Sequence, residues 1–270
     1  MVAPLRIALM GASGRMGGAL VNGILDDPTL QLVAALTRAD DPLLGVDAGT
    51  HVGRAALGVP FAVDVVAGVA ACDLVIDFSR PAATLKVLAA CRAAHRPLVL
   101  GTTGFDADGL LALDAAAGDI ALCQAANFSV GVNVCLNLLG VAARALGPAY
   151  DVEIVEAHHR HKVDAPSGTA LAMGRAVADA SGRTLEAAAV YGRHGDTGER
   201  QPGTIGFAAV RGGDVVGDHT VMFLGDGERV EITHRASSRA TFAGGALRAA
   251  HWLAGKVSGR YDMRDVLGLR

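Results

Sequence analysis

Five short apolar runs, separated by segments with helical patterning, occupy the first half of the chain. They cover residues 5–10, 30–36, 72–78, 96–100 and 120–123. Apolar runs without polar alternation are typical of strands that are buried on both faces of a parallel sheet. Pro81 stands just after the third run, where it suits the first turn of a helix. The pattern therefore predicts an α/β fold, a doubly wound parallel sheet of the Rossmann type with right-handed crossovers.

The pattern changes after about residue 129. A long apolar helix is predicted over residues 130–146, and a strand over residues 151–157. Three later segments alternate polar and apolar residues, which indicates a mixed or antiparallel sheet with one covered face. These segments are residues 203–208, 219–223 and 228–234. A final apolar helix near residues 241–254 is expected to pack on the first domain.

We therefore expect two domains of different type. Residues 1–129 and 240–270 form a dinucleotide-binding domain, and residues 130–239 form an α+β domain. The chain of 270 residues is 51% hydrophobic but only 4% aromatic, so its core must consist mainly of Ala, Val, Leu and Ile.

Charge and cysteine content restrict the class of protein. The formal net charge of −3 gives no global basic field that would favour nucleic acid or an anionic membrane as a partner. The cysteines lack metal-ligand spacing and have apolar neighbours, so we expect reduced, buried thiols in a cytoplasmic protein. They are Cys72, Cys91, Cys123 and Cys135. The first six residues do not have the pattern of a signal peptide.

Residues 120–143 carry no charged side chain, as a membrane span would. Amide and hydroxyl side chains interrupt this segment, and such groups are costly in hydrocarbon. They are Gln124, Asn127, Ser129, Asn133 and Asn137. A buried strand, a polar turn and a buried helix explain the segment better.

A glycine-rich turn follows the first predicted strand and opens a helix. Gly11, Gly14 and Gly17 have a variant of the usual dinucleotide-binding spacing, which is a weak signal in isolation. Its place after the first strand strengthens it, because glycines let a phosphate approach the backbone and the helix amides face the pyrophosphate. The alternative is a tight turn without a ligand. The predicted cofactor-binding residues here are Gly11, Ala12, Ser13, Gly14, Arg15 and Met16.

The end of the second strand bears on the choice of cofactor. An acidic residue is usual there, where it bonds the ribose diol, but this chain has Thr37 and Arg38. A hydroxyl and a cation suit a 2′-phosphate, and the alternative is a solvated arginine. Asp40 and Asp41 lie close in sequence, and if the loop folds them inward their charge would oppose the phosphate and favour NADH. Because these aspartates precede Pro42, we expect them to face solvent on a loop. NADPH should then be used at least as well as NADH.

Two further turns follow later strands, at the edge of the sheet where ligands of an open α/β fold bind. Each is either a plain turn or a contact for the nicotinamide half of the cofactor. The residues are Gly101, Thr102 and Thr103 in the first turn, and Ala125, Ala126, Asn127 and Phe128 in the second.

Titratable and charged side chains are most concentrated in residues 156–169, where three of the nine histidines fall within four positions. A nucleic-acid patch would need interleaved aromatic residues and a wider basic face. A metal site would need converging ligands, whereas the neighbouring His158 and His159 tend to diverge, so we expect no metal. A solvated charged loop is a third interpretation.

A site for an anionic substrate with a proton donor is the interpretation that we favour. Arg160, Lys162 and the histidines supply cations, and histidine titrates near neutrality. A helix is predicted to begin at Ser167, Gly168 and Thr169. The first amides and the dipole of such a helix would bind a carboxylate.

Long strings of this sequence resemble, in order, those of bacterial 4-hydroxy-tetrahydrodipicolinate reductases, also called dihydrodipicolinate reductases. The resemblance covers nearly the whole chain and is densest at residues 158–170. Further matching strings are residues 14–17, 101–105, 126–133, 197–200, 202–206 and 237–239.

The resemblance implies an enzyme of diaminopimelate and lysine biosynthesis that reduces a cyclic dicarboxylate with NADH or NADPH. It implies that His158 is the general acid/base and that Lys162 is its proton-donating partner. It also implies cofactor contacts at the three turns above, and a homotetramer joined through the sheet of a substrate-binding and oligomerisation domain. The implied substrate-binding residues are His159, Lys162, Gly168 and Thr169.

Two residues depart from the family pattern. Many relatives have Glu where this chain has Thr37, and a glycine is common in relatives where this chain has Ser13. Two other hypotheses also stay open at this point. An amino-acid or sugar-acid dehydrogenase of similar layout would need different cations after the strand at residues 151–157. A nucleotide sensor would have no need of both His158 and Lys162.

Overall fold

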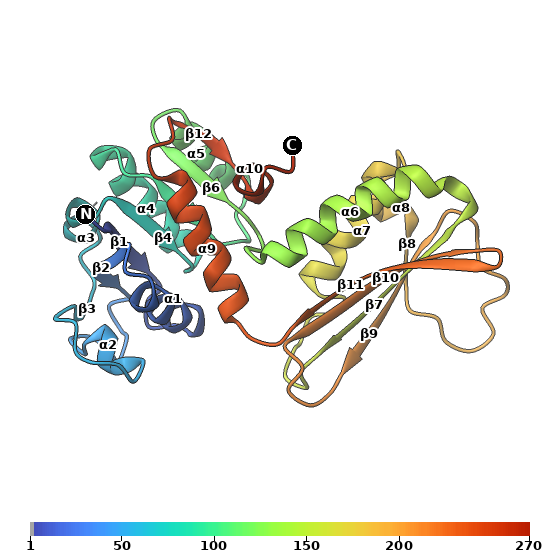
Figure 1. Ribbon diagram of the computed structural model, residues 1–270, viewed down its shortest axis with the longest axis horizontal. Coiled ribbons are helices and arrows are strands. Elements are labelled where there is room, and N and C mark those ends of the chain that lie inside the picture. Colours follow the sequence, from blue (N-terminus) through green and yellow to red (C-terminus); the bar gives the residue numbers. More distant parts are fainter. Residues whose placement is uncertain (1–2) are drawn as a thin grey trace. The chain divides into compact units, whose positions relative to one another are not determined.

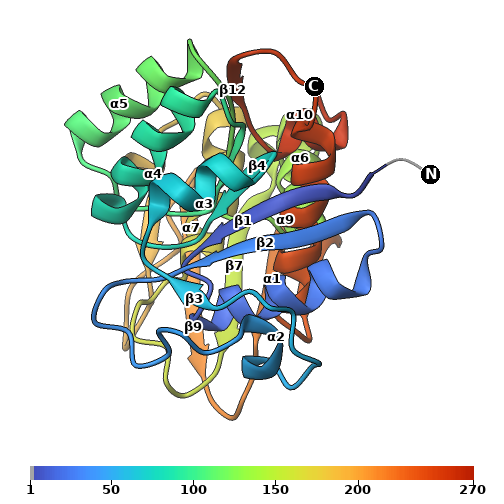
Figure 2. The same ribbon diagram turned by 90° about the vertical axis from the view of Figure 1, so that its left-hand side faces the viewer.

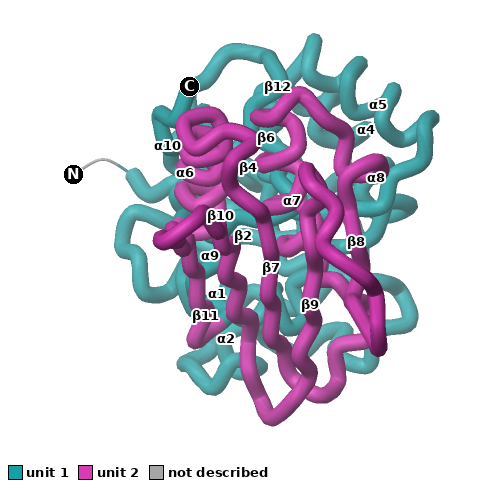
Figure 3. The backbone as a smooth tube through the Cα atoms, turned by 90° about the vertical axis from the view of Figure 1, so that its right-hand side faces the viewer, with its two compact units in different colours: residues 1–130, 239–270 teal, residues 131–238 magenta. Residues whose placement is uncertain are grey.

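The computed structural model describes residues 3–270 and divides into two compact units. The first ends at residue 130 and resumes over residues 239–270, and the second comprises residues 131–238 (Figure 3). The boundaries expected from the sequence differ from these by one residue. Met1 and Val2, which belong to the segment for which we expect no signal peptide, lie outside the described residues.

The first unit contains one parallel sheet, with its strands in the order β12-β6-β5-β4-β1-β2-β3 (Figure 1). The strands are β1 (Leu5–Met10), β2 (Leu30–Leu36), β3 (Phe61–Ala62), β4 (Leu74–Asp77), β5 (Leu98–Leu100), β6 (Ala121–Gln124) and β12 (Gly259–Tyr261). The helices are α1 (Arg15–Asp26), α2 (Ala48–His51), α3 (Val65–Ala71), α4 (Pro81–Ala94), α5 (Ala107–Ala117), α9 (Ala240–Leu253) and α10 (Met263–Leu267). This strand order is that of a doubly wound nucleotide-binding sheet, so the predicted fold class is confirmed.

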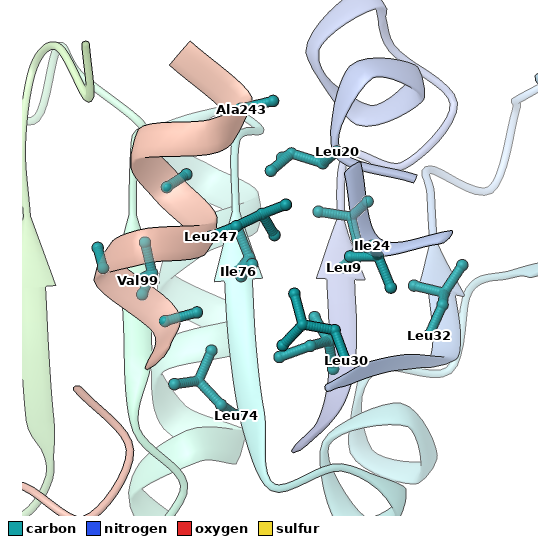
Figure 4. Packing of buried hydrophobic residues seen from close by; sticks show 14 of the residues in the cluster. Leu9, Leu20, Ile24, Leu30, Leu32, Leu74, Ile76, Val99, Ala243 and Leu247 are labelled. Carbon is teal, nitrogen blue, oxygen red and sulfur yellow. The ribbon is translucent and has the colours of Figure 1, made fainter. Parts of the chain in front are cut away.

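Helices cover both faces of this sheet, which explains the continuous apolar runs of its strands. On one face, Leu20 of α1 and Leu247 of α9 belong to the same buried cluster as Leu9 and Ile76 of the sheet (Figure 4). Helix α9, the apolar helix predicted near residues 241–254, thus packs on the sheet of the first unit, as expected. Helices α3, α4 and α5 cover the other face (Figure 2). The strand order reverses between β1 and β4, and ligands of open α/β sheets bind at the carboxyl ends of such strands.

The second unit contains a mixed sheet, with its strands in the order β11-β10-β7-β9-β8. The strands are β7 (Asp151–His158), β8 (Ala189–Tyr191), β9 (Ile205–Arg211), β10 (Gly217–Gly225) and β11 (Glu228–Ala236). The helices are α6 (Val130–Leu146), α7 (Gly168–Ala180), α8 (Leu185–Ala188) and a 3-10 turn at Gly147–Ala149. Burial alternates along β7 and β10 because α6 and α7 cover only one face of the sheet. The predicted alternation therefore reflects one-sided burial.

The uncharged segment of residues 120–143 forms β6, a turn and most of α6, as predicted. By length and composition alone, the helical stretch Val130–Ala149 is apolar enough to cross a membrane. The core helix of a soluble protein passes the same test, and Cys135, Leu139 and Ala143 of α6 lie in the core of the second unit. The four cysteines are buried free thiols, as expected. The short edge strands β3, β8 and β12 were not predicted from the sequence.

Candidate active site

The glycine-rich turn joins β1 to α1, and the packing around it requires glycine at two positions. Gly11 has a φ of 79°, and a Cβ there would lie 2.7 Å from the carbonyl oxygen of Phe78. A Cβ on Gly17 would lie 2.3 Å from the carbonyl oxygen of Ala12. The turn is therefore pressed between β4 and α1, which leaves its outer side for a ligand.

The start of α1 is left without a side-chain cap. Gly14 is the N-cap residue and makes no side-chain hydrogen bond, whereas Asp64 and Asp106 cap α3 and α5 through their carboxylates. The first amides of a helix, here those of Arg15 and Met16, have no acceptor within the helix. An uncapped helix start that lacks a Cβ fits the pyrophosphate of a dinucleotide.

A cluster of three oxygen-bearing side chains lies at the end of β2. The Asp41 carboxylate is 2.6 Å from Ser13 Oγ and 2.5 Å from Thr37 Oγ1, and it accepts the Leu43 amide at 3.0 Å. The two hydroxyls are 2.8 Å apart. Hydrogen bonds from Ser13, Thr37 and Leu43 lower the pKa of Asp41 to about 2, so this group is ionised at neutral pH.

This cluster corrects one expectation from the sequence. Asp40 does face solvent, with a side chain that is 80% exposed, and it pairs with Arg38 at 3.2 Å. Asp41 instead folds back, because the buried hydroxyl of Thr37 needs an acceptor and the carboxylate supplies it. Arg38 is 64% exposed. The prediction that both aspartates face solvent is therefore wrong for Asp41.

A buried carboxylate holds the loops that follow β4 and β5. Asp77 is fully buried, which raises its pKa, and it accepts the Ser79 amide at 2.9 Å and Thr84 Oγ1 at 2.7 Å. The Ser79 amide also donates to Thr102 Oγ1 at 3.1 Å. Thr102 Oγ1 lies 3.5 Å from Asp77 as well, so Asp77 and Ser79 together tie the two loops to each other. Sequence reasoning did not select it, although an acidic residue at the end of an apolar strand was the available signal.

The two later turns expose some predicted residues and bury others. Thr103, Ala125 and Ala126 line a pocket with Arg260 and Tyr261, next to the carboxyl ends of β5 and β6. The side chains of two further predicted residues are buried, so these residues offer mainly their backbone to a ligand. They are Thr102 and Phe128. The two remaining predicted residues are Gly101, which lies against the Phe78 ring, and Asn127, whose side chain accepts the Ser129 amide.

Glu156 and His158 lie two residues apart on β7, on the covered face of the second sheet. Glu156 is 1% exposed and lies 2.6 Å from Nδ1 of His158. It also accepts the Arg211 guanidinium at 2.6 and 2.7 Å and the Ser167 amide at 3.1 Å. Burial disfavours the charge, but the hydrogen bonds from Arg211 and His158 outweigh it, so the pKa of Glu156 is lowered.

This contact fixes the tautomer of His158. An ionised carboxylate can only accept, so Nδ1 of His158 carries a proton, and Nε2 is left for proton exchange. A Cβ on Gly217 of β10 would lie 3.0 Å from that Nε2, so the glycine leaves room beside it. A residue pair of this kind, a buried carboxylate behind an imidazole, suits a general acid.

His219 lies beside this pair. Its ring centroid is 5.0 Å from that of His158, and burial lowers its pKa to about 4. Its Nε2 is 2.9 Å from Ser167 Oγ, which also accepts the Ala170 amide at 3.1 Å. Ser167 is thus the N-cap of α7, which begins at Gly168 as predicted.

The other residues predicted in the basic segment lie on the turn after β7. Lys162 Nζ is 2.9 Å from an oxygen of Asp164, and its side chain is 20% exposed. The rings of His159 and His161 are 6.2 Å apart. Within residues 3–270, no group of three His, Cys, Asp or Glu side chains is arranged to hold a metal ion.

Sequence reasoning missed the role of Glu156 and did not identify Arg211 or His219. The signal for Glu156 was available, because an acidic residue two positions before a histidine shares its face of a strand. Arg211 is recognisable only from the sheet register, in which it pairs with His158 across β7 and β9.

Two family models match the chain. Dihydrodipicolinate reductase, N-terminus, matches residues 5–128, and dihydrodipicolinate reductase, C-terminus, matches residues 131–267. The 4-hydroxy-tetrahydrodipicolinate reductase of Laribacter hongkongensis is 59% identical over 98% of this chain and 99% of its own. That of Burkholderia lata is 58% identical over 98% of this chain and 100% of its own.

A solved structure shows the same fold. A dihydrodipicolinate reductase from a Paenisporosarcina species, with dipicolinate bound, has a TM-score of 0.77 and covers 96% of this chain and 97% of its own. Its identity of 23% supports the likeness of fold alone. The two family models and the long, closely similar relatives establish more: this chain belongs to the dihydrodipicolinate reductase family.

Proposed function

We propose that this chain reduces 4-hydroxy-tetrahydrodipicolinate to tetrahydrodipicolinate with NADH or NADPH, in diaminopimelate and lysine biosynthesis. Membership of the family supports the reaction. The observation that carries the roles of the residues is the His158 imidazole, which a buried carboxylate holds in one tautomer. The reaction releases the 4-hydroxyl as water and adds one hydride and one proton to the ring.

The first unit holds the cofactor in this proposal. The amides at the uncapped start of α1 bind the pyrophosphate, and the loops after β5 and β6 bind the nicotinamide half. When bound, the reduced nicotinamide supplies the hydride. The residues are those of the three turns, 11–16, 101–103 and 125–128.

His158 gives the proton that the ring gains. Glu156 keeps Nδ1 protonated and stabilises the positive charge of the imidazolium, so Nε2 carries the transferable proton. Lys162 assists as a second proton donor, and its exposed partner Asp164 holds it only weakly. Glu156 and Arg211 act through His158, which makes them positioning residues.

The start of α7 binds a carboxylate of the substrate. Gly168 is exposed, and among the described residues outside its own helical turn and chain neighbours no atom lies within 4 Å of where its Cβ would be. The Ser167 hydroxyl accepts the Ala170 amide, and the carboxylate is proposed to bind at Gly168 and Thr169, in the first turn of the helix. His159 adds a further polar contact from the turn after β7.

The test is turnover of His158→Gln and Lys162→Ala, followed by absorbance of the reduced nicotinamide with freshly prepared substrate. General acid catalysis contributes about 10² to 10⁴-fold, so each variant should lose activity on that scale and keep its affinity for NADPH. His194→Gln, at an exposed histidine, is the matched control. Near-normal turnover in both variants would rule out the catalytic roles.

We also propose that the protein is a cytoplasmic homotetramer, assembled through the second sheet. The face that α6 and α7 leave uncovered carries Val155, Met222 and Val210, and Val210 is 53% exposed in the single chain. Apolar side chains on an uncovered sheet face favour association. Light scattering should give a molar mass of about four times the 27.4 kDa of one chain. A monomer at micromolar concentration would contradict the proposal.

A further inference from the structure

The turn after β1 and the end of β2 form one rigid junction. The amides of Gly11 and Ala12 both donate to the Leu36 carbonyl oxygen, at 3.0 and 3.1 Å. Ser13 Oγ and Thr37 Oγ1, 24 residues apart in sequence, thereby lie 2.8 Å from each other. In dinucleotide-binding sheets this junction receives the adenosine ribose, and an acidic residue at the end of the second strand bonds its hydroxyls.

Thr37 occupies that strand end here, but the charge comes from Asp41. Two hydroxyls and one amide fix its carboxylate, and each carboxylate oxygen can accept about two hydrogen bonds. The oxygen that takes the Leu43 amide therefore keeps room for a ribose hydroxyl. We propose that Asp41 sets the cofactor preference of this chain and that it favours NADH over NADPH.

Two features of the cluster oppose a 2′-phosphate. The carboxylate lies where the phosphate charge of about −2 would be placed, and like charges repel. The hydroxyls of Ser13 and Thr37 would otherwise donate to the phosphate, but each has one proton and already gives it to Asp41. A ribose diol can donate to the carboxylate, so it meets neither obstacle.

Arg38 does not reverse this balance. It is 64% exposed and its guanidinium pairs with Asp40, whose side chain is 80% exposed. Exposed pairs of this kind contribute little, and solvent screens them. Arg38, Asp40 and Asp41 together carry a net charge of −1, which still repels a phosphate. This conclusion replaces the expectation, drawn from Thr37 and Arg38 alone, that NADPH is preferred.

The inference rests on the proposed function only through the identity of the cofactor, so binding without substrate tests it. Nicotinamide fluorescence would give the Kd of NADH and of NADPH for the wild type and for Asp41→Asn. We expect the wild type to bind NADH at least tenfold more tightly, and Asp41→Asn to shift the ratio of the two Kd values about tenfold toward NADPH. Asp40→Asn, one residue away and exposed, is the matched control and should shift the ratio less than threefold.

The ratio also separates this inference from other failures. General damage to the fold weakens both cofactors and leaves their ratio unchanged, and Thr37→Val, which keeps the carboxylate, should preserve the NADH preference. A wild type that binds NADPH more tightly would overturn the inference, whatever the variants do. An unchanged ratio in folded Asp41→Asn would overturn it as well. Failure of the proposed reductase function would instead appear as no binding of either cofactor, or as binding without turnover.

Discussion

The two units of this chain present their chemistry with different parts of the polypeptide. In the first, the main-chain amides at the start of α1 have no side-chain cap, and a nearby carboxylate, Asp41, is half-buried and held by two neutral hydroxyls. In the second, Glu156 is 1% exposed and is held by a guanidinium and an imidazole. A carboxylate near solvent stays ionised with neutral donors, whereas a buried one needs a countercharge.

The difference explains what each region is suited to do. An open helix start beside a half-buried charge can admit and select a charged ligand. A buried, fully bonded charge cannot meet a ligand, but it can orient the imidazole of His158. The following variants test this contrast, from the largest expected effect to the smallest.

The largest effect on stability is expected from Glu156→Gln. Breaking a buried ion pair by removing one partner costs about 3 to 5 kcal/mol, because the Arg211 charge loses its partner. Turnover should also fall tenfold or more while the Kd of NADH stays unchanged, since His158 loses its orientation. Asp41→Asn is the comparison, and it should lower the unfolding free energy much less than Glu156→Gln, because this carboxylate is held by neutral donors near solvent. Equal losses from urea denaturation of the two variants would remove the contrast between the carboxylates.

The second effect is a loss of stability in acid that depends on His219. Its pKa is about 4 in the folded chain against 6.5 for an ordinary histidine, because burial disfavours its charge. Between pH 6.5 and 4.5 the unfolded chain therefore binds a proton at this residue that the folded chain does not. The unfolding free energy should fall by about 2 to 3 kcal/mol as the pH falls through this range.

His219→Gln should flatten that part of the profile, whatever its effect at pH 7. Glu156 and His158 lie next to His219 and act on its pKa. The pKa of Glu156 is lowered in the folded chain, so its carboxylate stays ionised over this pH range and does not produce the slope. His194→Gln, at an exposed histidine, should leave the slope as it is in the wild type. The idea fails if His219→Gln keeps the full slope between pH 6.5 and 4.5.

The smallest effects concern the two helix starts. Ser167→Ala removes the cap of α7 and should cost about 1 kcal/mol. Gly14→Ser, at the uncapped start of α1, should change stability by only a few tenths of a kcal/mol. It should nevertheless weaken NADH binding, because a side chain then stands where the pyrophosphate approaches. Thermal unfolding and the Kd of NADH measure the two effects, and unchanged NADH affinity in Gly14→Ser would place the pyrophosphate elsewhere.

The sequence by itself determined the features that depend on neighbouring residues. Apolar runs and their period showed which strands are buried on two faces and which on one. The glycines of the first turn and the start of α7 at Gly168 could be read directly, because a turn and a helix cap involve only a few consecutive residues. The basic segment around His158 was recognisable for the same reason.

Only the tertiary structure decided which side chains meet. Asp41 reaches Ser13 across 28 residues, His219 reaches Ser167 across 52, and Arg211 reaches Glu156 across 55. The contact of Arg211 with Glu156 depends on the register of β9 against β7, and a shift of one residue would turn Arg211 to the other face of the sheet. The other two contacts depend on how loops that follow one strand are brought against other parts of the chain. That is why a local reading placed Asp41 in solvent and passed over Arg211: the energy of a buried or half-buried charge is set by partners that lie far away in the sequence.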